Sequence, residues 1–148
     1  MAYDRRITHY HKRIASFKGR IDDCNKRIEE CNTKIASYHV RIASYNERIA
    51  DNKAQIAIYE KKLADGNTRT THYTKLIACC HKRIETNNRL IETCPKSITA
   101  ITKRLPGYQK RIALYTKSIA AFEEKIAVAN EKKEAFYSSE RHREFLLA

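Results

Sequence analysis

The sequence is poor in the residues that end regular secondary structure. It has three glycines, two prolines and no tryptophan in 148 residues. Since Gly and Pro are the strongest turn signals, a chain with so few of them predicts a small number of long elements. All-β and α/β folds, which need a turn after each short strand, are therefore disfavoured.

Long apolar runs are also absent from the sequence. Apolar residues make up 42% of the chain, but they stand apart between polar residues, and none of the stretches approaches the roughly 18 residues of a membrane helix. The segment that begins at Met1 has no apolar core of a signal peptide. We therefore expect a cytoplasmic protein, or one incorporated into a virus particle assembled in the cytoplasm, whose core is a narrow seam.

The five cysteines are an odd number and include no C-x-x-C pair. This pattern indicates reduced thiols in a reducing compartment rather than a disulfide scaffold. Cys79-Cys80-His81 is the densest group of metal-ligand types. Adjacent residues of a helix diverge by about 100°, so these side chains do not converge on one ion. We expect structural thiols, with no metal and no cofactor.

A seven-residue repeat dominates the chain. Counting one apolar position as a, the residue three further on, at d, is mostly apolar as well. Alternating steps of three and four over so many heptads are typical of a left-handed coiled coil. Position a holds Ile7, Ile14, Ile21, Ile28, Ile35, Ile42, Ile49, Ile56, Leu63, Ile77, Ile84, Ile91, Ile98, Leu105, Ile112, Ile119 and Ile126, with Thr70 as the interruption. Position d includes Tyr10, Phe17, Cys24, Cys31, Tyr38, Tyr45, Tyr59, Tyr73, Cys80, Cys94, Ile101, Tyr108, Tyr115 and Phe122.

The fold predicted from this repeat is all-α, a long antiparallel coiled-coil hairpin that forms a single domain over residues 1–148. Gly66 suits the end of one helix, and Asn67 or Thr68 can cap the next. The first arm covers about residues 3–64, the loop 65–71 and the second arm about 72–135, and an overhanging tip covers 136–148. Pro95 and Pro106 are expected to kink the second arm, because the a spacing continues through both.

Two alternatives share this pattern. One is a parallel homo-oligomeric rod, and the other is a three-helix antiparallel bundle that folds back at Pro106-Gly107. In the preferred hairpin, facing a and d residues have numbers that add to 136. The flanking g positions support that register, because Gln55 then faces Arg83 and Arg48 faces Leu90, which avoids contacts between like charges.

Polar residues at d positions offer a further check on this register. Asn52 and Asn87 occupy adjacent layers of the predicted hairpin, so their amides are candidates for a mutual hydrogen bond. A buried Asn commonly fixes the register of a coiled coil. The alternative interpretation is that both residues merely tolerate a partly exposed seam.

No catalytic motif is present. The sequence contains no glycine-rich phosphate loop and no nucleophile elbow, and a two-helix rod has no cavity in which to desolvate a transition state. The six histidines are scattered along the predicted surface. We therefore expect no enzyme activity, no catalytic residues and no small-molecule substrate.

Charge is the most informative feature for function, since the formal net charge is +13. Bases gather at g, whereas e is mainly neutral, so an antiparallel hairpin would have one long cationic side and one neutral polar side. An acidic protein surface is the expected partner of the cationic side. The residues assigned to this partner-binding side are Arg6, Arg13, Arg20, Arg27, Lys34, Arg41, Arg48, Arg104, Arg111 and Lys125.

A second candidate surface lies near the C-terminal end of the sequence. There the heptad fades, and apolar side chains reappear on a segment that the predicted register leaves without a partner. They could form a docking tip or a cap on the open end of the rod. These residues are Phe136, Tyr137, Phe145, Leu146 and Leu147.

Together these features predict a non-enzymatic structural protein that acts as a brace, spacer or scaffold in a large assembly, for example as a minor virion, capsid or cytoskeletal component. The alternative is a protein that binds or condenses nucleic acid without sequence preference. Binding to an anionic membrane is a third option, which the mostly polar outer faces argue against. Self-association is compatible with each of these functions.

Overall fold

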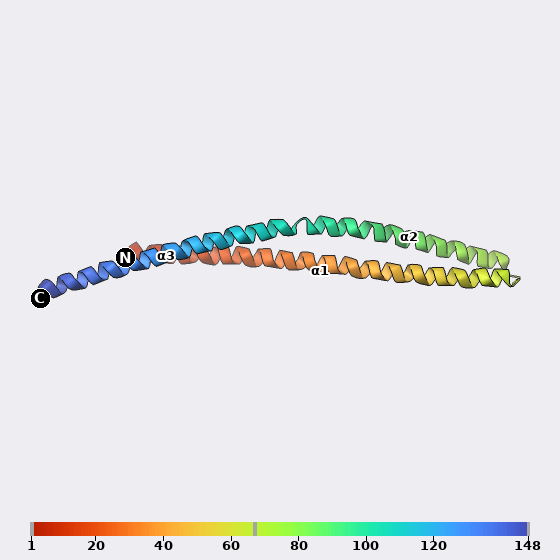
Figure 1. The fold of residues 1–148 in the computed structure, drawn as a ribbon, viewed down its shortest axis with the longest axis horizontal. Coiled ribbons are helices and arrows are strands. Elements are labelled where there is room, and N and C mark those ends of the chain that lie inside the picture. The colour runs from red at the N-terminus through yellow and green to blue at the C-terminus, as the bar shows by residue number, and fades with distance from the viewer. Residues whose placement is uncertain (1, 67, 148) are drawn as a thin grey trace. The chain divides into compact units, whose positions relative to one another are not determined.

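The described residues, 2–66 and 68–147 of a computed structural model, form three α-helices and no strand. They are α1 (Ala2–Ala64), α2 (Thr70–Thr102) and α3 (Leu105–Leu147), labelled in Figure 1. The predicted all-α class is confirmed.

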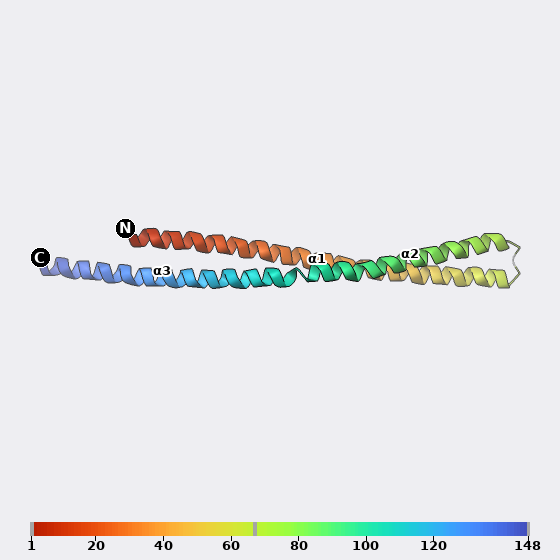
Figure 2. The ribbon, with the colours of Figure 1, turned by 90° about the horizontal axis from the view of Figure 1, so that it is seen from above.

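The chain divides into two packed units. In unit 1, α1 up to Glu29 packs against α3, and in unit 2, α1 from Glu30 packs against α2 (Figures 1 and 2). Each unit by itself is an antiparallel pair of helices, so the predicted hairpin-like packing is confirmed. Neither unit packs three helices together, as the three-helix alternative would require.

The buried residues follow the seven-residue repeat. From Ile7 to Ala129, every a and d position is buried or half-buried except Gly66 and Thr70, which lie at or next to the connection between α1 and α2. Most other positions are exposed. The seam is narrow, and no large side chain among the described residues is completely buried. The most buried residues are Ile14, Cys24, Cys31, Ile49, Ile56, Cys80, Asn87, Cys94, Ile101 and Ala129.

Ring contacts show the register within each unit. In unit 1 the Tyr10 and Phe122 rings lie 5.8 Å apart, as do those of Phe17 and Tyr115. In unit 2 the same centroid distance joins Tyr59 and Tyr73. Both residues of each pair are at d positions, and their numbers add to 132. This sum differs by four residues, about one helical turn, from the 136 predicted for facing a and d residues.

The end of α1 has a glycine in the left-handed conformation. Gly66 has a φ of +79°, which is strained for any residue with a Cβ atom. The amide of Gly66 donates to the Leu63 carbonyl at 3.2 Å, which satisfies a carbonyl of the last turn. The sequence-based role of Gly66 as a helix terminator is confirmed.

The predicted cap of α2 is wrong at Thr68. Arg69 is the residue that precedes the helix, and its carbonyl accepts the first helical hydrogen bond, from the Tyr73 amide at 3.1 Å. Thr68 is one residue too early to be the N-cap, and the Arg69 side chain forms no cap hydrogen bond. Asn67, the other candidate, lies outside the described residues.

The two prolines have different positions. Pro95 lies inside α2, whereas Pro106 lies in the first turn of α3, where the helix needs no amide donor. The interruption between α2 and α3 consists of Lys103 and Arg104, whose amides donate to Thr99 and Ile101 at 3.0 Å. The helix is thus interrupted just before Pro106, while α2 continues through Pro95.

Candidate functional site: two rows of basic side chains

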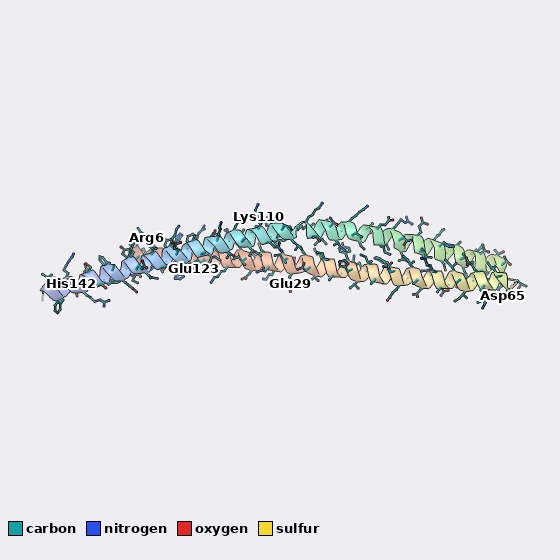
Figure 3. All side chains as sticks on the ribbon, viewed as in Figure 1. Arg6, Glu29, Asp65, Lys110, Glu123 and His142 are labelled. Carbon is teal, nitrogen blue, oxygen red and sulfur yellow. The ribbon has the colours of Figure 1, made fainter. Side chains whose placement is uncertain are left out.

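The ten basic residues assigned to the partner-binding side are all exposed. Unit 1 contains Arg6, Arg13, Arg20, Arg27, Arg111 and Lys125, and unit 2 contains Lys34, Arg41, Arg48 and Arg104. Figure 3 labels Arg6 near the start of α1, and the side chains in this view project outward from the helices. The bases are therefore open to a partner on the surface of each unit.

The sequence places most of these bases next to an aromatic ring. A d-position aromatic is followed three residues later by a g-position base, and residues three apart are neighbours on a helix. The Arg41 guanidinium carbon lies 5.0 Å from the centre of the Tyr38 ring, and that of Arg20 lies 5.3 Å from Phe17. Such cation–π contacts orient the charged group along the edge of the seam.

In unit 1, bases from opposite helices meet over the same ring. Arg27 of α1 and Arg111 of α3 lie 6.0 Å and 5.9 Å from the centre of the Tyr108 ring. In the same way, Arg13 and Lys125 lie 5.7 Å and 5.1 Å from Phe122. One base from each helix thus lies within about 6 Å of the same ring centre. Like charges on neighbouring side chains repel each other, and an anion that contacts both relieves this repulsion.

The ion pairs Asp4–Lys133 and Glu140–Arg143 include none of the ten bases. Arg20, Arg27 and Arg111 line a hollow of about 150 Å³ beside Tyr115. Asp23 lines the same hollow, but no ion pair joins it to these arginines. The site can therefore accept carboxylate or phosphate oxygens from outside the chain.

An ion pair between the helices of unit 1 joins Asp4 to Lys133. The hydrogen bond from the Lys133 ammonium lowers the pKa of Asp4, and the hydrogen bond to that carboxylate raises the pKa of Lys133. Both groups are solvent-accessible, so the surrounding water screens their attraction. This pair lies outside the ten-residue set, because Asp4 is at an e position and Lys133 is at an a position.

Unit 2 has a groove of about 660 Å³ between α1 and α2. Its lining includes Gln55 and Arg83, and also Arg48 and Leu90, the two pairs that the charge argument placed face to face. The groove therefore agrees with the predicted register of the g positions.

Asn52 and Asn87 also line this groove, but the hydrogen bonds of their amide nitrogens differ from the one we considered. Asn52 Nδ2 donates to the Arg48 carbonyl at 2.7 Å, and Asn87 Nδ2 donates to the Arg83 carbonyl at 2.9 Å. Each amide group donates to the carbonyl four residues earlier in its own helix. This bond does not depend on the position of the other helix.

Cys24, Cys31, Cys80 and Cys94 are buried at d positions, and Cys79 is exposed. All five are free thiols. Within the described part of the chain, no three His, Cys, Asp or Glu side chains lie close enough to hold a metal ion.

The apolar tip residues do not form one cluster. Phe136 and Tyr137 contact each other, with ring centres 5.8 Å apart. Phe145, Leu146 and Leu147 lie on the last turns of α3, about 12 Å or more further along the helix axis. The predicted docking tip is thus split into two apolar sites, and Tyr137 is the half-buried member of the set.

Sequence reasoning did not identify the ring contacts themselves. Lys62, which lies 5.3 Å from the Tyr73 ring, was also not included among the partner-binding bases. The signal was present in the repeated aromatic-x-x-base spacing, as in Tyr45 and Arg48 or Tyr108 and Arg111. Contacts between the helices require the register as well, and spacing alone does not give it.

Comparisons with protein-family models, with curated proteins and with solved structures found no match to this chain. Across the described residues, none of the helices combines the length and apolar character needed to span a bilayer.

Proposed function

We propose that each unit is a two-stranded antiparallel coiled coil, and that the protein acts as a structural brace or scaffold. Its basic rows, the ten exposed bases assigned to the partner-binding side of the two units, bind an acidic protein surface. The coiled coil is supported by the burial of successive a and d positions. In this proposal Pro95 bends α2, because a proline removes one helical hydrogen bond. A second bend lies near Pro106, next to the interruption at Lys103 and Arg104.

The observation that carries the proposed function is the contact of two bases, one from each helix of unit 1, with the same ring. Arg27 and Arg111 meet at Tyr108, and Arg13 and Lys125 meet at Phe122. A carboxylate between two such bases would relieve their repulsion and gain a charge-assisted hydrogen bond from each. The partner therefore supplies negative charge at intervals along the helix pair.

The spacing of the bases favours an acidic protein over nucleic acid. Bases that recur every seven residues lie about 10.5 Å apart along a helix. Carboxylates on another helix can repeat at the same interval. A straight row of Lys and Arg side chains laid along B-DNA would cross a given groove about once per 34 Å turn. Most of these side chains would therefore not contact a phosphate.

A charge-neutralised variant tests this proposal in unit 1. Arg13, Arg20, Arg27 and Arg111 are changed to Gln in one protein. In a control protein, the exposed f-position residues Lys12, Lys26, Lys110 and Lys117 are changed to Gln, which removes the same charge. Binding to poly-L-glutamate and to double-stranded DNA is measured for both, after circular dichroism shows that both remain helical.

We expect the g-position variant to lose at least tenfold more affinity for poly-L-glutamate than the f-position control, because its bases converge in pairs. Equal losses in the two proteins would show that net charge alone drives binding. Tighter binding to DNA than to poly-L-glutamate near physiological salt would overturn the proposal and support the nucleic-acid alternative.

A further inference from the structure

The last turns of α3 extend beyond the start of α1 in unit 1, as both ribbon views show (Figures 1 and 2). Asp4 in the first turn of α1 pairs with Lys133, so the residues after Tyr137 have no described α1 residue beside them. Residues 141–147 are all exposed, and Leu147 retains 82% of its accessible surface. We call residues 136–147 the tail.

The a and d stripe continues into the tail. Counting on from Ile126 and Ala129, the next positions are Lys133, Phe136, Glu140, Arg143 and Leu147. The first of these forms the ion pair with Asp4 of α1. The remaining four form a stripe along the tail, with one apolar residue at each end and two opposite charges in the middle.

We propose that two copies of this protein join through their tails, which pack antiparallel around a twofold axis. In an antiparallel pair, a faces d of the other helix. Phe136 then faces Leu147 of the second copy, and Glu140 faces Arg143 of the second copy. All four layers follow from this one register, in which facing residue numbers add to 283.

The stripes of two copies are complementary when the tails are antiparallel but not when they are parallel. The antiparallel pair has an apolar contact at each end and two ion pairs at the centre. A parallel pair would place Glu140 against Glu140 and Arg143 against Arg143, so like charges would face each other at both layers. Within one chain Glu140 and Arg143 lie 3.9 Å apart at an exposed site, which is a weak ion pair.

The tail interface has the properties of a reversible contact. It continues the seam that already holds α3 against α1, so both copies present a preformed helix. The overlap covers about two heptads, which places the buried area at the small end of specific interfaces. An interface related by a twofold axis uses the same surface on both partners, and therefore closes after two copies.

Charge reversal tests the register. The full chain is studied with its thiols reduced, by sedimentation equilibrium over a range of concentrations. We expect a monomer–dimer equilibrium for the native protein. E140R and R143E each place like charges in two central layers, and each should weaken the dimer by about tenfold or more.

Restoration gives the sharper readout. The double variant E140R/R143E should recover the dimer. An equimolar mixture of the two single variants should also associate, because the introduced arginine of one faces the introduced glutamate of the other. R141E and E131R, at exposed positions outside the stripe, make matched charge changes and should leave the equilibrium unchanged.

Three results would overturn the proposal. They are a native protein that stays monomeric at all concentrations, a dimer that the single reversals do not weaken, and a mixture that fails to associate. Binding of the native protein to lipid vesicles without self-association would instead assign the exposed Phe145, Leu146 and Leu147 to a membrane surface. None of these results depends on the basic rows, so the proposed function is tested separately.

Discussion

Basic side chains at g cover the aromatic rings at d, and this contact has a measurable consequence for stability. Arg20 lies over both Phe17 and Tyr115, which belong to different helices of unit 1. Replacing Arg20 with Ala should lower the free energy of unfolding by about 0.5–1 kcal/mol, as the cation–π contact and the packing of its aliphatic stem are lost.

Lys18 provides the matched control for this substitution. It is an exposed base on the same helix and is not among the bases that lie over a ring. Lys18→Ala should change stability by less than about 0.5 kcal/mol in urea unfolding followed by circular dichroism. Equal effects of the two substitutions would contradict the role assigned to the ring contact.

The Asp4–Lys133 ion pair predicts a defined pH dependence. The hydrogen bond from Lys133 lowers the pKa of Asp4 below its ordinary 3.8, so the stability from this carboxylate is present above that value and is lost as the pH falls through the folded-state pKa. Lys133 has a pKa raised above 10.5, so its contribution is lost as the pH rises through that higher value. The pair therefore stabilises unit 1 between these two limits.

Asp4→Asn should be less stable than the native protein at neutral pH, and the difference should disappear in strong acid. Thermal unfolding at a series of pH values measures it, and the carboxyl ¹³C shift of Asp4 reports the lowered pKa directly. Asp22→Asn makes the same charge change at another exposed carboxylate of α1 and is the control. If the native protein and Asp4→Asn had the same thermal stability at every pH, the ion pair would not persist in solution.

At the level of the helices, Gly19 inside α1 and Gly66 just after it have opposite roles, although neither would bring an added Cβ atom within 4 Å of another group. Gly66 has a φ of +79° after the last turn, whereas Gly19 lies inside the helix. Gly66→Ala should destabilise the protein by about 1 kcal/mol through backbone strain. Gly19→Ala should stabilise it by about 0.5–1 kcal/mol through helix propensity.

Thermal unfolding of both variants beside the native protein tests this opposition in one experiment. Both substitutions add one methyl group where no other group lies within 4 Å, so a difference in sign must come from the backbone conformation. Destabilisation by Gly19→Ala, or no effect of Gly66→Ala, would contradict the helix end assigned to α1.

The sequence was sufficient to predict the helical class, the residues of the seam and the break at Gly66, because each depends on local spacing or local backbone chemistry. The start of α2 after Arg69 could not be predicted, since one residue of loop geometry decides which carbonyl accepts the first hydrogen bond of α2. The hydrogen bonds of Asn52 and Asn87 were also missed, because the i−4 carbonyl competes with a cross-seam partner and sequence does not show which is nearer. The division into two units after Glu29 could not be predicted, because the heptad repeat is equally regular on both sides of this residue.

For the whole molecule, the charge excess should make salt stabilising. Each unit has more bases than acids, with 16 Lys and Arg against 10 Asp and Glu in unit 1 and 14 against 7 in unit 2. Ions screen the repulsion between paired bases such as Arg27 and Arg111. The melting temperature should therefore rise by about 2–8 °C, or roughly 1 kcal/mol, between low and high NaCl.

The variant with Gln at Arg13, Arg20, Arg27 and Arg111 should show a smaller rise, because it lacks these repelling bases. Differential scanning calorimetry of both proteins at several salt concentrations measures the difference. A melting temperature that falls with salt would mean that attractive ion pairs outweigh repulsion, against the charge distribution described for the two units.

The short connection at residues 65–69 also decides how the protein responds to force. In unit 2 the Lys62–Tyr73 contact joins residues 11 apart in the chain, whereas in unit 1 the Asp4–Lys133 contact spans 129 residues. Closing the shorter loop costs less conformational entropy, so unit 2 is expected to fold first and unit 1 to fold after it. Tension applied between Ala2 and Leu147 would break the a and d contacts of unit 1 one layer at a time. A force perpendicular to the helices of this unit would instead be distributed over many layers.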